Sequence, residues 1–380
     1  MAIEFQKGSY AEMIINYIAL CGEFPWDGID LMGRSRRIVL RNIRNLKKEG
    51  FITVNGKAEM KTLRITKKAF DKLDERVLHH YLSMTENHKF RGGTKSSGNS
   101  GAIQTWRRHR MAEILCVLKD SGVRVWDFTK PYIDMNQYNE KLIEPSDKVF
   151  YTSRQIKNAD ESQSKKTSFT RIMGVLFSPG GIYCVYHTNK GLIKWQRQGE
   201  IKAQILVEDI VECNYNKKTD SRFRADDAIM FGKGMDVAVD ILESTGGKRT
   251  YNNFEMLSFD NTYRNIHYIT LDGNGERQLQ IIMDHDWRNK LLNLLFPPEI
   301  IANKYSSIDC DAITDDAYIM SFLDGNIGKL KRFKQSSLIV NDKSFEILCF
   351  PWQAESIGNY MPNAIIRSVE LNDIMPYFED

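Results

Sequence analysis

The sequence of 380 residues contains no run of about 18 apolar residues, the length that a membrane-spanning helix needs. Its first residues include an acid, Glu4, and no long apolar segment, so we expect no secretory signal. Cysteine is scarce: the sequence has six, they lie far apart, and no C-x-x-C occurs. This spacing favours reduced thiols over a disulfide framework or a zinc site. Together these absences predict a cytoplasmic protein that does not enter a membrane.

Motifs for catalysis and for nucleotide binding are also missing. The sequence has no G-x-x-x-x-G-K-[ST], G-x-G-x-x-G, H-E-x-x-H or G-x-S-x-G. None of the seven histidines has a Cys or His partner at metal-ligand spacing. An acidic group at Asp309, Asp311, Asp315 and Asp316 is interpreted as a solvated loop. We therefore expect no cofactor and no bound metal, and we favour a protein that is not an enzyme.

Charge is present but unevenly distributed. Residues 1–110 hold 21 Lys and Arg against 11 Asp and Glu, a net charge of +10. The remaining residues hold 32 basic and 38 acidic side chains, a net charge of −6. This separation predicts a module that binds a polyanion, joined to an acidic part with another role.

Composition also predicts where the domains divide. Residues 85–102 contain four glycines and three serines and almost nothing to bury, which is typical of a flexible linker. We therefore predict a first domain at residues 1–84, a linker at 85–102 and a second domain at 103–380. The second domain is expected to split into two subdomains near residues 297–310.

Local patterns assign most elements of the first domain. Ser9, Ser35 and Thr66 stand where helix N-caps are expected, before apolar residues at helical spacing. Asn55-Gly56 is a strong hairpin signal between two apolar segments. We expect helices at residues 10–21, 26–32, 36–49 and 67–82, and strands at 51–54 and 62–65.

The second domain mixes both kinds of element. Helices are expected at residues 103–118, 201–210, 235–242 and 286–295. Strands are expected at residues 123–126, 338–340 and 344–350, and hairpins at 172–186 and 266–283. The second hairpin is expected to turn at Asp272-Gly273-Asn274-Gly275. The fold class is therefore α/β or α+β, with the topology of the second domain left open.

Residues 9–84 resemble a winged helix-turn-helix domain in the order helix, helix, helix, hairpin, helix. Residues 46–52, LKKEGFI, are similar to the L-x-x-x-G-F-I passage from recognition helix to wing. Residues 65–69, ITKKA, are similar to the L-T-x-x-G exit of bacterial winged-helix regulators, with Ile65 and Ala69 departing from that pattern. The resemblance covers about a fifth of the chain and implies a DNA-binding domain.

The third helix of this domain has two faces. Val39, Ile43 and Leu46 recur at the spacing of a buried stripe. The residues predicted to contact double-stranded DNA are the second stripe Arg37, Arg41, Arg44 and Lys48, the helix start Ser35 and Arg36, and the wing residues Lys57 and Lys61. An arginine of the stripe can form two parallel hydrogen bonds with a guanine. The alternative is a solvated helix face without a partner.

A second basic cluster begins the next helix. Its candidate nucleic-acid contacts are Trp106, Arg107, Arg108 and Arg110, because an aromatic ring among arginines can stack on a base. The favoured alternative is a structural one, in which Trp106 packs into the second domain at the start of an amphipathic helix.

One enzymatic alternative concerns Glu200 and Lys202. A restriction-type nuclease places E-x-K on a strand to hold a magnesium ion and a water molecule, and Glu200-Ile201-Lys202 has that spacing. The sequence that follows predicts a helix, so these two residues are only weak catalytic candidates. A metal-dependent nuclease directed to DNA by the winged helix therefore stays open as an alternative function.

The whole chain also resembles, in layout, the replication-relaxation proteins of plasmids and integrative elements. The shared features are a winged-helix front, a basic helix at residues 107–113 and an α/β remainder. This resemblance implies a DNA-binding regulator or accessory factor in the replication or transfer of a mobile element, with protein partners at the acidic domain. A module that binds protein without DNA is a further alternative. The patterns predict neither the DNA site nor the oligomeric state.

Overall fold

The computed structural model of the chain divides into two compact units, residues 1–130 and residues 131–380. Helices and strands alternate in both units, so the chain has a mixed α/β architecture as expected. Among the helices in the described ranges, none is long and apolar enough to cross a bilayer. The structure describes residues 6–85, 99–133, 143–159, 170–189, 197–215, 223–243, 262–303 and 306–378.

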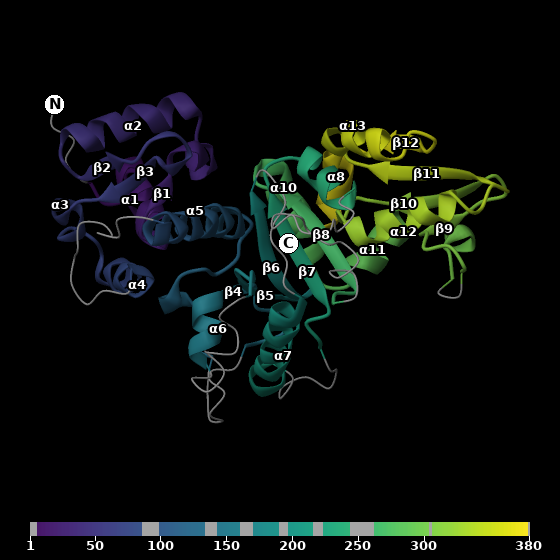
Figure 1. Cartoon of the computed structure of the whole chain (residues 1–380), viewed down its shortest axis with the longest axis horizontal. Helices are drawn as coiled ribbons and strands as arrows, with labels where there is room; N and C mark the ends of the chain where they lie inside the picture. Colours follow the sequence, from purple (N-terminus) through teal and green to yellow (C-terminus); the bar gives the residue numbers. More distant parts are fainter. Residues whose placement is uncertain are drawn as a thin grey trace. The chain divides into compact units, whose positions relative to one another are not determined.

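The first unit, purple to blue in Figure 1, packs helices around a small sheet. Strand β3 lies in the middle of this sheet and pairs antiparallel with both β1 and β2. The elements in chain order are α1 (Tyr10–Cys21), β1 (Phe24–Pro25), the 3-10 helix η1 (Trp26–Met32), α2 (Arg36–Lys48), β2 (Ile52–Asn55), η2 (Ala58–Met60), β3 (Thr62–Ile65), α3 (Lys67–Phe70), α4 (Glu75–Thr85), α5 (Asn99–Asp120) and η3 (Asp127–Thr129).

Most elements of this unit lie where the sequence predicted them. Helices α1 and α2, the helical turn η1 and the hairpin β2–β3 are confirmed. The single helix predicted at residues 67–82 is wrong, because the chain forms α3 and α4 separately. Asp74 explains the interruption, since its carboxylate accepts the backbone N–H of Arg76 and begins a new helix.

Helix α5 belongs to the first unit, so the chain divides later than predicted. The apolar side chains of Ile114, Leu115 and Leu118 are buried, and the Tyr17 hydroxyl donates to Asp120 Oδ1 at 3.0 Å. Residues 86–98 of the predicted linker lie outside the described residues. Residues 99–102, predicted to belong to that linker, are the first turn of α5. An amphipathic helix beyond the Gly/Ser-rich segment thus completes the core of the first unit.

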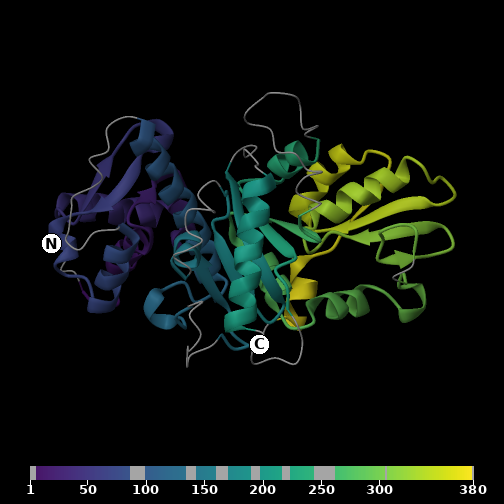
Figure 2. The ribbon, with the colours of Figure 1, turned by 60° about the horizontal axis from the view of Figure 1, so that its bottom comes forward.

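The second unit contains two sheets, teal and yellow-green in Figure 2. The first has the strand order β4-β5-β6-β7-β8, antiparallel from β4 to β6 and parallel from β6 to β8. Strands β7 and β8 follow helical crossovers. The elements are β4 (Val149–Thr152), α6 (Ser153–Ala159), β5 (Gly174–Ser178), β6 (Gly181–Asn189), α7 (Arg197–Asn214), β7 (Asp227–Gly232), α8 (Met235–Glu243), β8 (Asn265–Thr270), α10 (Gly273–Met283) and α11 (Trp287–Leu295).

The second sheet has the strand order β12-β11-β10-β9 and follows the short helix η5 (Pro298–Ile300). Strands β10, β11 and β12 are parallel, with a helix in each crossover, and β9 is antiparallel. The change of sheet falls near residues 297–310, but the split into two subdomains predicted there stays a prediction, because residues 131–380 form one compact unit. The elements are β9 (Ala312–Ile313), β10 (Ala317–Ser321), α12 (Ile327–Ser337), β11 (Ser344–Cys349), α13 (Pro351–Tyr360), β12 (Ile365–Ser368), α14 (Leu371–Ile374) and η6 (Met375–Tyr377).

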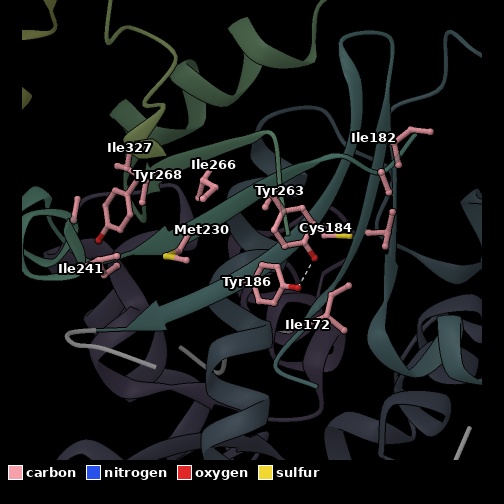
Figure 3. Close-up of a cluster of buried hydrophobic side chains, with 14 of the residues drawn as sticks. Ile172, Ile182, Cys184, Tyr186, Met230, Ile241, Tyr263, Ile266, Tyr268 and Ile327 are labelled. Atoms are coloured by element: carbon pink, nitrogen blue, oxygen red, sulfur yellow. Dashed lines mark hydrogen bonds between the residues drawn. The ribbon is translucent and has the colours of Figure 1, made fainter. Parts of the chain in front are cut away.

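One apolar core runs through both sheets of the second unit. Strands β7 and β8 are buried along almost their whole length, as parallel strands covered on both faces are. Figure 3 shows part of this core, where the hydroxyls of Tyr186 and Tyr263 share a hydrogen bond of 2.6 Å. The bond helps to satisfy two polar groups that are buried in this core.

The hairpin predicted at residues 266–283 is wrong. Strand β8 is followed by helix α10, whose N-cap Asp272 accepts the backbone N–H of Gly275 at 2.9 Å. A Cβ on Gly275 would lie 1.8 Å from the carbonyl oxygen of Thr270, so the close approach of helix to strand requires glycine. The D-G-N-G segment therefore begins a helix, although its composition is also typical of a turn.

Two predicted strands are also wrong. Residues 123–126 join none of the sheets among the described residues, although Val123 and Val125 are buried. Residues 338–340 follow the last turn of α12, and Leu338 and Ile339 are 78% and 84% exposed. Apolar composition suggested two strands, but the first segment forms only an isolated β-bridge at Arg124 and the second continues from a helix.

We expect a fragment of residues 1–130 to unfold cooperatively and a fragment of residues 1–84 to be much less stable. The shorter fragment loses α5 and exposes the apolar surface that this helix covers. Its melting temperature should be lower by more than about 10 °C, measured by circular dichroism. Equal melting temperatures would show that α5 does not contribute to the core of the first unit.

Candidate nucleic-acid interface

Helix α2 exposes a basic face because its opposite face is buried. The side chains on that face, Val39, Ile43 and Leu46, are each at most 1% exposed, so they belong to the core of the first unit. At 100° per residue, the stripe Arg37, Arg41, Arg44 and Lys48 lies on the other side of the helix. All four of these side chains are exposed, as predicted.

The four cations of this stripe, which we call the α2 basic face, are uncompensated. Among the described residues, none of them has an acidic partner within salt-bridge distance, whereas the neighbouring Arg36 pairs with Asp30. Like charges one helical turn apart destabilise a helix by about 0.2–0.5 kcal/mol per pair. The repulsion between these cations therefore destabilises the helix, and anions bound along the face would reduce that repulsion.

Ser35 stands at the N-cap position, as predicted, but its side chain makes no capping hydrogen bond. Its backbone carbonyl instead accepts the N–H groups of Ile38 and Val39 at 2.8 and 3.1 Å. Gly33, with φ of +71°, turns the chain just before it. The exposed hydroxyl is consequently available to a ligand at the positive end of the helix.

The two wing lysines differ in their surroundings. Lys57 is exposed in the loop between β2 and β3. The ammonium of Lys61 lies 3.5 Å from the centroid of the Trp26 ring, and its backbone carbonyl accepts the Trp26 N–H at 2.9 Å. Lys61 thus connects the hairpin loop to Trp26, whereas Lys57 is exposed in that loop.

In the second predicted cluster, Trp106 to Arg110, one arginine is paired with a buried acid. Arg108 binds Glu23 Oε1 at 3.0 Å, and Arg64 of β3 binds Glu23 Oε2 at 2.7 Å. Glu23 is fully buried, so this pair of arginines neutralises a carboxylate inside the first unit. Of the cluster, Arg107 alone is exposed, whereas Trp106 and Arg110 are half-buried.

Trp106 contacts a residue of its own helix. Its ring meets the His109 ring edge-on, with centroids 6.2 Å apart. Burial lowers the pKa of His109 below its ordinary value, so the ring stays neutral near pH 7. The structural interpretation of this cluster therefore agrees better with the geometry than a nucleic-acid contact does.

Sequence reasoning missed Glu23, which connects the sheet to α5. A single acid between Gly22 and Phe24 gives no sign that it is buried, because both of its partners lie far along the chain. The bond to Arg108 spans 85 residues. Such a residue is found from tertiary structure and not from a local pattern.

The E-x-K of the nuclease alternative lies on helix α7, not on a strand. Glu200 is fully buried and accepts from Thr170 Oγ1 at 2.5 Å, from the Arg171 N–H at 2.6 Å and from the Tyr186 hydroxyl at 3.3 Å. Lys202, two residues further along the helix, is exposed. The two side chains point in different directions and cannot share a metal site.

The acidic group near residue 310 was interpreted as a solvated loop, and two of its members are instead paired. Asp309 binds Arg332 at 2.7 Å, and Asp311 binds Lys329. Asp315 and Asp316 are exposed. Within the part of the chain that the structure describes, no group of Asp, Glu, His or Cys is arranged to hold a metal ion.

No family model matches the chain, and comparisons with curated proteins and with solved structures find no similar protein. The function is therefore inferred from the residues and their geometry.

Glu200 should make stability depend on pH. Burial raises the pKa of Glu200, so its contribution to stability is present below the unfolded pKa and is lost as the pH rises through the folded pKa. The Glu200→Gln variant does not lose stability in this way, because glutamine does not ionise. We expect the free energy of unfolding of the variant, relative to the wild type, to increase from pH 4 to pH 7 in urea titrations. A difference that is constant with pH would contradict this role for Glu200.

Proposed function

We propose that the first unit is a winged helix-turn-helix domain and that the chain binds double-stranded DNA in a sequence-specific manner. The observation that carries the proposal is the α2 basic face, four exposed cations without acidic partners in the described structure. The unit as a whole has 24 basic and 14 acidic side chains, which adds a long-range attraction to a polyanion.

The geometry suits a helix that enters the major groove. That groove admits an α-helix, and the first turns of a recognition helix usually contact the base edges. Arg37 and Arg41 lie in the first half of α2, where they would meet bases, and Lys48 lies in its last turn. Lys57, on the exposed loop of the hairpin, would contact a phosphate beside the groove.

Charge also separates this function from the alternatives. A DNA complex that replaces counterions on several phosphates loses affinity steeply as salt increases. A module that binds protein through an apolar surface would not show that dependence. The nuclease alternative is not supported, because Glu200 and Lys202 do not converge.

The second unit has a separate role in this proposal. Its 29 basic and 35 acidic side chains give a net charge of −6, so it is poorly suited to duplex DNA. We assign it to protein partners or regulation. The layout that resembles replication-relaxation proteins extends the proposal to an accessory factor in the replication or transfer of a mobile element.

Replacing Arg41 by Ala should weaken binding of the full chain to its preferred site by about 1–3 kcal/mol and relax its specificity. Replacing Lys57 by Ala should weaken binding equally on all sequences and lower the salt slope by about one. Mobility shifts on a selected site and on random DNA, at several salt concentrations, measure both effects. Lys61 is unsuitable for this test, since its substitution also removes the contact with Trp26.

Arg76→Ala is the matched control, because Arg76 is an exposed arginine on α4, away from α2 in Figure 1. It removes the same charge from the first unit and should leave the affinity nearly unchanged. Loss of specificity in Lys57→Ala, with uniform weakening in Arg41→Ala, would assign base reading to the wing. Binding that does not vary with salt would contradict the proposal.

A further inference from the structure

We propose that a cavity between the two sheets of the second unit binds a small molecule through one phosphate group. The cavity has a volume of about 220 Å³ and lies among the start of β8, helix α11 and the end of β10 with the first turns of α12. The end of a parallel strand followed by a helix N-terminus is a common place for ligands in α/β proteins. The site does not depend on DNA binding by the first unit.

Only some of the cationic side chains at this cavity are paired with an acidic side chain. Four cations line it: Arg264, Arg288, Lys329 and Arg332. Lys329 is paired with Asp311 and Arg332 with Asp309. Arg264 and Arg288 have no carboxylate partner among the described residues. Two guanidinium groups without a carboxylate partner can each donate hydrogen bonds to one phosphate group, which offers more acceptor oxygens than a carboxylate does.

A buried hydroxyl supplies an independent indication of a ligand. Ser321, the last residue of β10, is 6% exposed and lines the cavity, yet its Oγ has no hydrogen-bond partner in the described protein. Its backbone N–H is occupied by Asp311 Oδ2 at 2.7 Å. A buried hydroxyl is seldom left unsatisfied, and this one could donate to a phosphate oxygen.

The acids at the cavity do not exclude an anion, because two of the three are paired with cations and the four cations exceed the three acids by one. Asp309 and Asp311 are the partners of the two paired cations. Asp324 accepts the backbone N–H of Asn326 at 3.1 Å, and its carboxylate lies 3.5 Å from Nδ1 of His267. The ion pairs also hold Lys329 and Arg332 in place around the phosphate position.

The test uses the full chain with inorganic phosphate as the probe at constant ionic strength. We expect a saturable rise in melting temperature with phosphate and none with acetate. Arg288→Ala should weaken the apparent phosphate affinity by about tenfold or more. Arg277→Ala, which removes an exposed arginine from the adjacent helix α10, should leave it unchanged.

Ser321→Ala separates binding from folding. Because the hydroxyl has no partner in the protein, its removal should leave the melting temperature without phosphate unchanged or higher, while the phosphate affinity falls about tenfold. Arg41→Ala should keep the phosphate response, which distinguishes this cavity from the α2 basic face. The proposal fails if wild type shows no saturable response, if acetate acts like phosphate, or if Arg277→Ala equals Arg288→Ala. It also fails if Ser321→Ala retains wild-type affinity.

Discussion

The burial of one face of helix α2 determines which side chains the opposite face exposes. Burial of Val39, Ile43 and Leu46 fixes the rotation of α2, and the remaining face must then carry Arg37 and Arg41 outward. Gly50 lies two residues after the end of the helix, and its φ of +74° reverses the chain before β2. The orientation of the basic face and the start of the hairpin are therefore consequences of three apolar contacts and one glycine.

Glu23 connects the sheet of this unit to α5. Its carboxylate binds β3 through Arg64 and α5 through Arg108. Removing one partner from a buried ion pair is costly, because the remaining charge loses its compensation. The arginines of the first unit thus fall into two groups, one that maintains the fold and one that remains available to an anion.

The sequence predicted those parts of the fold that depend on neighbouring residues. Helix α2 was predictable because its apolar spacing and its terminal glycines all lie within 18 residues. The role of Arg108 was not, since its partner lies 85 residues away. Strand β7 was missed because side chains buried on both faces do not alternate between apolar and polar. The D-G-N-G segment was misassigned because an Asp N-cap and a hairpin turn use the same residues. The cavity depends on residues from β8, α11 and α12, which no single window of sequence brings together.

The contact between Glu23 and Arg108 has a consequence for the order of folding during synthesis. Residues 1–85, which include α1, α2 and the hairpin, leave the ribosome before α5 does. Until residue 108 emerges, Glu23 has only Arg64 as a partner, so the nascent unit holds a carboxylate that is half compensated. The arrival of α5 both covers the apolar side of α1 and completes this ion pair. The unit that carries the basic face of α2 is therefore complete only after α5 has been synthesised.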